Sequence, residues 1–272
     1  MNRFLVEQGG ALASDALTHL RKAQGSPGIR QIHALRVAIK RMRALVTIVH
    51  ALRPEAKRPR RALHHWKRMF RVIGELREQQ VCAQMVRRMR GIPAEHRQAY
   101  LRHASEQADR LTAEAVDLMR GMSARDGERI RRYVEKAVAD ADDRALMKHL
   151  NAALRSGWQD ARRAMRSRSC DLHALRKQVK RVWYILRLLE KAERPLPKGI
   201  PARSLGELQR VLGEWHDARV LVDDVGAWHG GGIAQRALMI AALHIQSNVQ
   251  EMVERTTERL SSMAHGPGRS SS

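Results

Sequence analysis

The sequence predicts an all-α protein made of two related helical bundles, and three observations support this prediction. Apolar residues recur at three- and four-residue spacing almost throughout the 272-residue chain. Alternating runs rich in Val, Ile and Thr, which are typical of strands, are missing. A segment of the first half also recurs in the second half at an offset of 140 residues. These features together indicate helices arranged as an internal duplication.

Clusters of glycine and proline divide the chain into long helical windows. They lie at residues 25–28, 54–59, 91–93, 121–127, 194–201 and 230–232. Because these residues terminate helices, we expect a helix boundary at each cluster. The last residues, 266–272, are expected to form a flexible tail. We therefore expect one composite domain over residues 1–265, made of two repeats that span about 1–137 and 138–265.

The duplication is supported by two separate matches. Residues 32–45, IHALRVAIKRMRAL, align without gaps to residues 172–185, LHALRKQVKRVWYI, with six of fourteen positions identical. Residues 71–75, RVIGE, align to residues 210–214, RVLGE, at an offset of 139. Because the offset is about half the chain length, we expect two related bundles that pack against each other with pseudo-twofold symmetry.

Each copy of the duplicated helix carries a core seam and a cationic stripe beside it. The seams, spaced by three and four residues, are Ile32, Leu35, Ile39, Met42, Val46 and Val49, and Leu172, Leu175, Val179, Val182, Leu186 and Leu189. The stripe positions follow seam positions by one residue, which turns them by about 100° around the helix. They are His33, Arg36, Lys40 and Arg43 in the first copy, and His173, Arg176, Lys180 and Arg187 in the second. Lys177 and Arg181 widen the second stripe, while Trp183 stands where the first copy has Arg43.

The cationic stripes predict a binding face for a polyanion. The chain carries 51 Lys+Arg and 28 Asp+Glu, a formal net charge of +23, and such a field attracts polyanions. Like charges at this spacing weaken an isolated helix, so helix stability is no reason for them. A solvated face would be free to use carboxylates, yet none occurs at residues 32–52 or 172–189.

The segment after each seam adds further cations and some carboxylates. Gly74 and Gly213 are expected to permit close helix approach, and the following turn offers Arg77 in one copy and His216 with Arg219 in the other. We expect the acidic residues of these turns to orient basic side chains through salt bridges rather than to bind metal. They are Glu75, Glu78, Glu214 and Asp217. His64, His65 and His229 are interpreted as surface or core residues without a function.

Several classes of function are disfavoured. The cations around His33 and His173 would repel a metal ion, and no nucleotide-binding loop, HExxH motif or nucleophile with an evident base occurs, so no cofactor, metal or enzymatic activity is expected. Cys82 and Cys170 are read as reduced thiols, and no signal peptide or membrane span is evident, which predicts a cytoplasmic protein. Non-specific nucleic-acid binding and a phosphoanhydride-processing enzyme or accessory module stay open as alternatives.

These motifs resemble a known family. Two copies of [IL]HALR followed by KR, each trailed by [IL]GE and a charged turn, are similar to the CHAD family, the conserved histidine α-helical domain. The resemblance implies two four-helix bundles arranged with pseudo-twofold symmetry around a central basic groove or pore. It also implies binding of inorganic polyphosphate and location at polyphosphate granules.

The resemblance assigns roles to matching positions. The family's histidine falls on His33 and His173, its arginine on Arg36 and Arg176, and its later basic pair on Lys40-Arg41 and Lys180-Arg181. Arg43 matches a further basic position, whereas Trp183 departs from it, and Gln79 and Gln80 replace frequently acidic residues. The ExExK signature of the triphosphate-tunnel domain, which accompanies some relatives, is missing.

Overall fold

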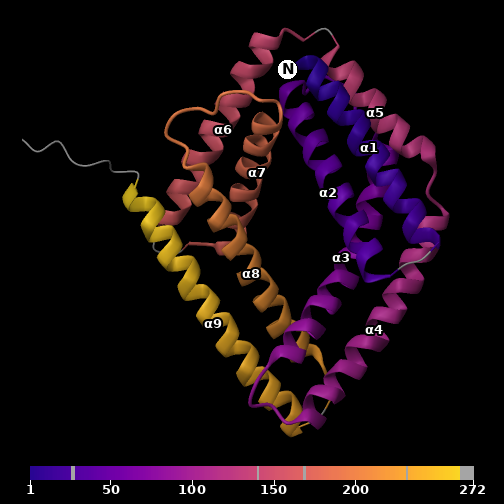
Figure 1. Cartoon of the computed structure of the whole chain (residues 1–272), viewed down its shortest axis with the longest axis vertical. Helices are drawn as coiled ribbons and strands as arrows, with labels where there is room; N and C mark the ends of the chain where they lie inside the picture. The colour runs from indigo at the N-terminus through magenta and orange to yellow at the C-terminus, as the bar shows by residue number, and fades with distance from the viewer. Residues whose placement is uncertain (26–27, 140, 168–169, 231, 264–272) are drawn as a thin grey trace, which may run out of the picture. The chain divides into compact units, whose positions relative to one another are not determined.

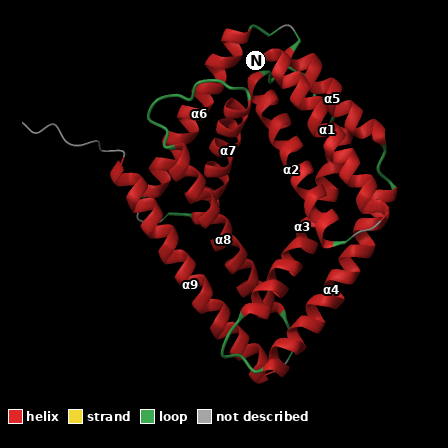
Figure 2. Cartoon of the chain, viewed as in Figure 1, coloured by secondary structure: helices red, strands yellow, loops and turns green. Residues whose placement is uncertain are grey.

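The computed structural model describes residues 1–25, 28–139, 141–167, 170–230 and 232–263. These residues form nine α-helices and no strand (Figures 1 and 2), which confirms the all-α prediction. The helices are α1 (Asn2–Gly25), α2 (Ile29–Leu52), α3 (Arg60–Arg88), α4 (Ala94–Arg120), α5 (Ala124–Val138), α6 (Asp143–Arg166), α7 (Leu172–Lys191), α8 (Ala202–Ala227) and α9 (Gly232–Met263). The predicted tail, 266–272, lies outside the described residues.

The chain forms two compact units, and the division between them falls within α6. The first unit, Met1–Met147, holds the five helices α1 to α5, whereas the resemblance implies four helices in each bundle. The second unit begins at Lys148 and holds most of α6 together with α7, α8 and α9. The predicted symmetry and central pore concern the placement of one unit against the other, and both stay predictions.

The first unit is organised around α2, which packs on α1, α3 and α5. All six predicted seam residues of α2 are buried, so the apolar periodicity identified the inner face of this helix. Helices α1 and α5 approach closely at two glycines. A Cβ atom added at Gly9 would lie 2.9 Å from a methyl carbon of Val134, and one added at Gly127 would lie 2.7 Å from a methyl carbon of Leu17.

The predicted break at 121–127 is longer than the observed one. Helix α5 begins at Ala124, after Ser123, whose hydroxyl accepts a hydrogen bond from the backbone N–H of Arg125 at 3.1 Å. Gly127 is therefore helical and buried. Its role is to admit Leu17 of α1, so this glycine serves helix packing rather than chain reversal.

In the second unit α7 and α9 both pack on α8. Five of the six predicted seam residues of α7 are buried, and the first, Leu172, is half-buried at the helix start. A Cβ atom added at Gly157 of α6 would lie 2.9 Å from a methyl carbon of Val182, so α6 approaches α7 at this point. The seam prediction thus holds in both units.

Two helix boundaries occur where the sequence has no glycine or proline cluster. Helix α6 follows Asp142, whose carboxylate accepts a hydrogen bond from the backbone N–H of Ala145 at 2.9 Å. Helix α7 follows Asp171, whose carboxylate accepts from the backbone N–H groups of His173 and Ala174 at 2.9 and 3.2 Å. Both boundaries are marked by aspartate N-caps. In the described residues, no helix is sufficiently long and apolar to cross a membrane.

Candidate functional site

The duplicated helices α2 and α7 place their basic residues in matching environments. His33 and His173 are exposed, Arg36 and Arg176 are half-buried, Lys40 and Lys180 are half-buried, and Arg41 and Arg181 are exposed. The Nε atoms of both Arg36 and Arg176 are buried. We call His33, Arg36, Lys40, Arg43 and Arg77 the first cationic track, and His173, Arg176, Lys180 and His216 the second cationic track. Lys177 lies beside the second track and is exposed.

The first track is formed where α2 packs against α3. The pKa of His33 lies below its ordinary value, first because neighbouring atoms shield its ring from solvent, and then because of the positive charges of Arg77, Arg36 and Lys40. The imidazole therefore reports that four basic side chains from two helices converge. Arg77, predicted as an additional cation, is thus close enough to act on His33.

Phe70 of α3 orders the arginines of the first track. The guanidinium carbons of Arg36 and Arg43 lie 5.1 and 4.6 Å from the centroid of its ring, both within the range of a cation–π contact. Burial also lowers the pKa of Arg43 below its very high ordinary value, and this guanidinium still stays charged at neutral pH. Sequence reasoning missed Phe70, although it continues the spacing of Gly74 and Arg77 backwards along α3.

The two glycines of this region do not have the predicted packing role. A Cβ atom added at Gly74 would meet the Arg36 side chain, with the nearest atom, Nε, at 3.8 Å. A Cβ atom added at Gly213 would meet nothing within 4 Å. Neither contact requires a glycine for close helix approach. Gly74 instead leaves the space beside α3 in which Arg36 lies.

The second track has the same histidine at its start but a different partner. The ring centroids of His173 and His216 lie 6.3 Å apart. His216 stands at the position that matches Arg77 in the offset of 139 residues, so the same site on the second helix faces the same histidine in both units. The prediction that Arg77 and His216 belong to the site is consistent with these contacts.

The far part of the second track is closed by an aromatic side chain. A Cβ atom added at Gly206 would lie 3.0 Å from the Trp183 ring, so the indole rests directly against α8. Arg187 lies 5.6 Å from the Trp183 ring centroid and also pairs with Glu190 at 2.6 Å. Trp183 therefore replaces the cation that Arg43 supplies in the first unit.

Two of the acidic residues form the ion pairs that were predicted. Glu75 lies 3.9 Å from Arg71, and the matching Glu214 lies 2.6 Å from Arg210, each one helical turn apart. Arg219 pairs with Asp223 at 3.1 Å along α8. Within the described ranges, no group of three or more histidine, cysteine or acidic side chains is arranged to hold a metal ion.

Comparison with known proteins places both tracks within one family. The model of the CHAD domain matches residues 11–224, a range that includes α2, α3 and α7 and most of α8. The chain is similar in fold to the crystal structure of the CHAD domain from the plant Ricinus communis, with a TM-score of 0.66, 18% identity, and coverage of 97% of this chain and 92% of that one. No curated protein sequence matches. The family match over most of the sequence, joined to the shared helical fold, shows that the chain belongs to the CHAD domain family.

Proposed function

We propose that this protein binds inorganic polyphosphate through its two cationic tracks and that it does so without catalysing a reaction. The observation that carries the proposal is the duplicated His, Arg, Lys, Arg pattern, with the same exposure at each position in both units. Exposed lysines and half-buried arginines suit a ligand that lies along a helix face, because arginine gives forked contacts to phosphate oxygens and lysine supplies a mobile charge.

The first track favours an anion because its cations repel one another. The pKa of His33 is held down in part by Arg77, Arg36 and Lys40, so the free site disfavours a further positive charge. A linear chain of phosphates would relieve this repulsion along the whole track. Binding driven in this way releases counterions and weakens steeply with added salt. Association with polyphosphate granules in the cytoplasm is part of the same proposal.

The direct test neutralises the centre of both tracks with Arg36→Gln, Lys40→Gln, Arg176→Gln and Lys180→Gln in one variant. At physiological salt we expect long-chain polyphosphate to bind at least about 100-fold more weakly, since each charged contact contributes about 1.5 kcal/mol or more. The slope of log affinity against log salt should fall by about 0.7 for each phosphate contact removed. Thermal unfolding would verify that the variant is folded, and unchanged affinity in a folded variant would refute the proposal.

A nucleic-acid ligand is the outcome that this test must separate. A protein with a net charge of +23 also attracts duplex DNA at low salt. We expect long-chain polyphosphate to displace duplex DNA from the protein at physiological salt. Displacement in the opposite direction would assign the tracks to nucleic acid. Release of orthophosphate from polyphosphate by the pure protein would contradict the non-catalytic role.

A further inference from the structure

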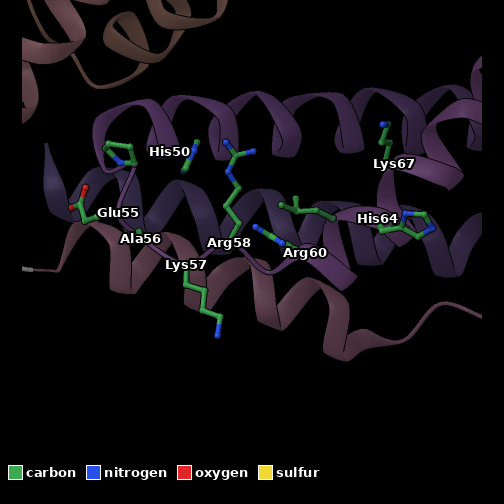
Figure 3. A pocket seen from close by; sticks show the side chains of 10 residues that line it. His50, Glu55, Ala56, Lys57, Arg58, Arg60, His64 and Lys67 are labelled. Atoms are coloured by element: carbon green, nitrogen blue, oxygen red, sulfur yellow. The ribbon is translucent and has the colours of Figure 1, made fainter.

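A hollow of about 990 Å³ lies at the turn between α2 and α3, and its lining is basic. It is lined by His50, Pro54, Glu55, Ala56, Lys57, Arg58, Arg60, Leu63, His64 and Lys67 (Figure 3). Glu55 supplies the carboxylate among these lining residues, all of which are described. Arg53 binds that carboxylate and thereby holds the pKa of Glu55 below its ordinary value. The wall therefore carries a large excess of positive charge.

The cations of this hollow are not engaged in ion pairs. No carboxylate in the described parts of the chain pairs with Lys57, Arg58, Arg60 or Lys67. Elsewhere in the same unit arginines do find partners, as Arg131 does with Glu128 at 2.7 Å. Grouping several unpaired cations around one concave surface costs repulsion, and folding alone gives no reason for it. An anionic ligand would supply the reason.

The hollow continues the first cationic track along both helices. On α2 the three- and four-residue spacing of the track leads from Arg43 through Thr47 to His50. On α3 the spacing leads back from Phe70 through Lys67 to Leu63 and Arg60. In Figure 3 the Arg58 side chain extends toward α2 and His50, whereas Lys57 extends to the other side. From His33 to His50 the distance along the helix axis is about 26 Å, at the usual rise per residue.

The second unit has no matching set of cations. In the offsets of 139 and 140 residues, His50 corresponds to Glu190, Arg58 to Pro197, Arg60 to Gly199 and Lys67 to Gly206. Glu190 is itself paired with Arg187, and Gly206 lies under the Trp183 ring. A cationic hollow at this turn is therefore a property of the first unit and does not follow from the duplicated motif.

We infer that the hollow is a second phosphate-binding site, which holds the part of a linear polyphosphate that extends beyond the first cationic track. The inference rests on the proposed function of that track. A long chain can occupy the track and the hollow together, and its affinity then benefits from both sites in one molecule. Tripolyphosphate is far shorter than about 26 Å, so it occupies either site but does not connect them.

The test compares two variants of the full chain with equal loss of charge. Arg58→Gln, Arg60→Gln and Lys67→Gln together remove the hollow's cations, and Arg102→Gln, Arg125→Gln and Arg144→Gln remove three exposed cations of α4, α5 and α6. We expect the hollow variant to bind long-chain polyphosphate about tenfold more weakly than the control, whereas tripolyphosphate should change by about twofold or less, as expected when linked sites are separated. Equal affinities of the two variants for the long chain would overturn the inference.

A measurement on the unaltered protein gives independent evidence. Modification of lysines by an amine-reactive ester, read by mass spectrometry, should show Lys67 protected by long-chain polyphosphate. Unchanged reactivity of Lys67 at saturating ligand would also overturn the inference. The failure of the proposed function is recognised separately, either because the unaltered protein does not bind polyphosphate or because loss of the track cations leaves binding unchanged while loss of the hollow cations weakens it.

Discussion

The two cationic tracks are alike where they begin and different where they end. Each begins with an exposed histidine that faces a residue of the next helix, followed by a half-buried arginine and lysine. Beyond this point the first unit adds Arg43, Phe70 and a basic hollow, while the second adds Trp183 and an ion pair of Arg187 with Glu190. The shared part defines a common phosphate-binding face, and the difference assigns the longer contact with the ligand to the first unit.

The largest effect within this comparison is expected when the tracks are disrupted one at a time. Arg36→Gln with Lys40→Gln should weaken long-chain polyphosphate binding about tenfold, and Arg176→Gln with Lys180→Gln about threefold, because single charged contacts contribute about 1–3 kcal/mol and only the first pair also separates the histidine end from the hollow. Titration calorimetry at physiological salt would measure both. Equal losses would mean that the longer track gives no advantage.

A smaller effect is expected at the matched glycines. Gly74→Leu should displace Arg36 from Phe70 and weaken binding about fivefold, the equivalent of about 1 kcal/mol. Gly213→Leu should leave binding unchanged, because the space beside Gly213 is open. Gly74→Ala serves as a second control, since its Cβ atom would lie in ordinary contact with Arg36 at 3.8 Å. A loss of affinity in Gly213→Leu as large as that in Gly74→Leu would contradict the role of Arg36.

The smallest effect concerns the protonation of His33. Its pKa is lowered in the folded protein, so protonation opposes folding, and this contribution to stability is lost as the pH falls below the ordinary histidine value. Bound polyphosphate should raise the pKa again, and affinity should then increase by up to a few-fold between about pH 8 and about pH 6. NMR titration would follow the ring directly. Lys40→Gln should raise the pKa in the free protein, because it removes one of the charges that depress it.

Much of the fold followed from local patterns in the sequence. The seams of α2 and α7 were predictable because buried positions of an amphipathic helix repeat with its geometry. The breaks at glycine and proline clusters were predictable because these residues interrupt helices. The starts of α6 and α7 were missed, since they depend on single aspartates, Asp142 and Asp171, that cap the backbone. Gly127 was misread because only tertiary contact with Leu17 explains it.

The candidate site was predictable in its duplicated part and not beyond it. The histidine, arginine and lysine of each track were found because two copies of one motif reveal what a single charged helix does not. Phe70 and the hollow were missed, because their residues acquire a shared role only when α2 and α3 fold back on each other. His64 had been interpreted as a residue without function, yet it lines the hollow.

Phe70 has a consequence for selectivity. It is one of two phenylalanines in the chain, and two guanidinium groups rest against its ring. Arginines held in this way lose little rotational freedom when a ligand arrives, so less of the binding free energy is spent on ordering them. Their spacing is also fixed before the encounter. A rigid pair of charges discriminates among polyanions by the interval between their negative groups, which would let this protein distinguish a dense phosphate polymer from a sparser one of equal total charge.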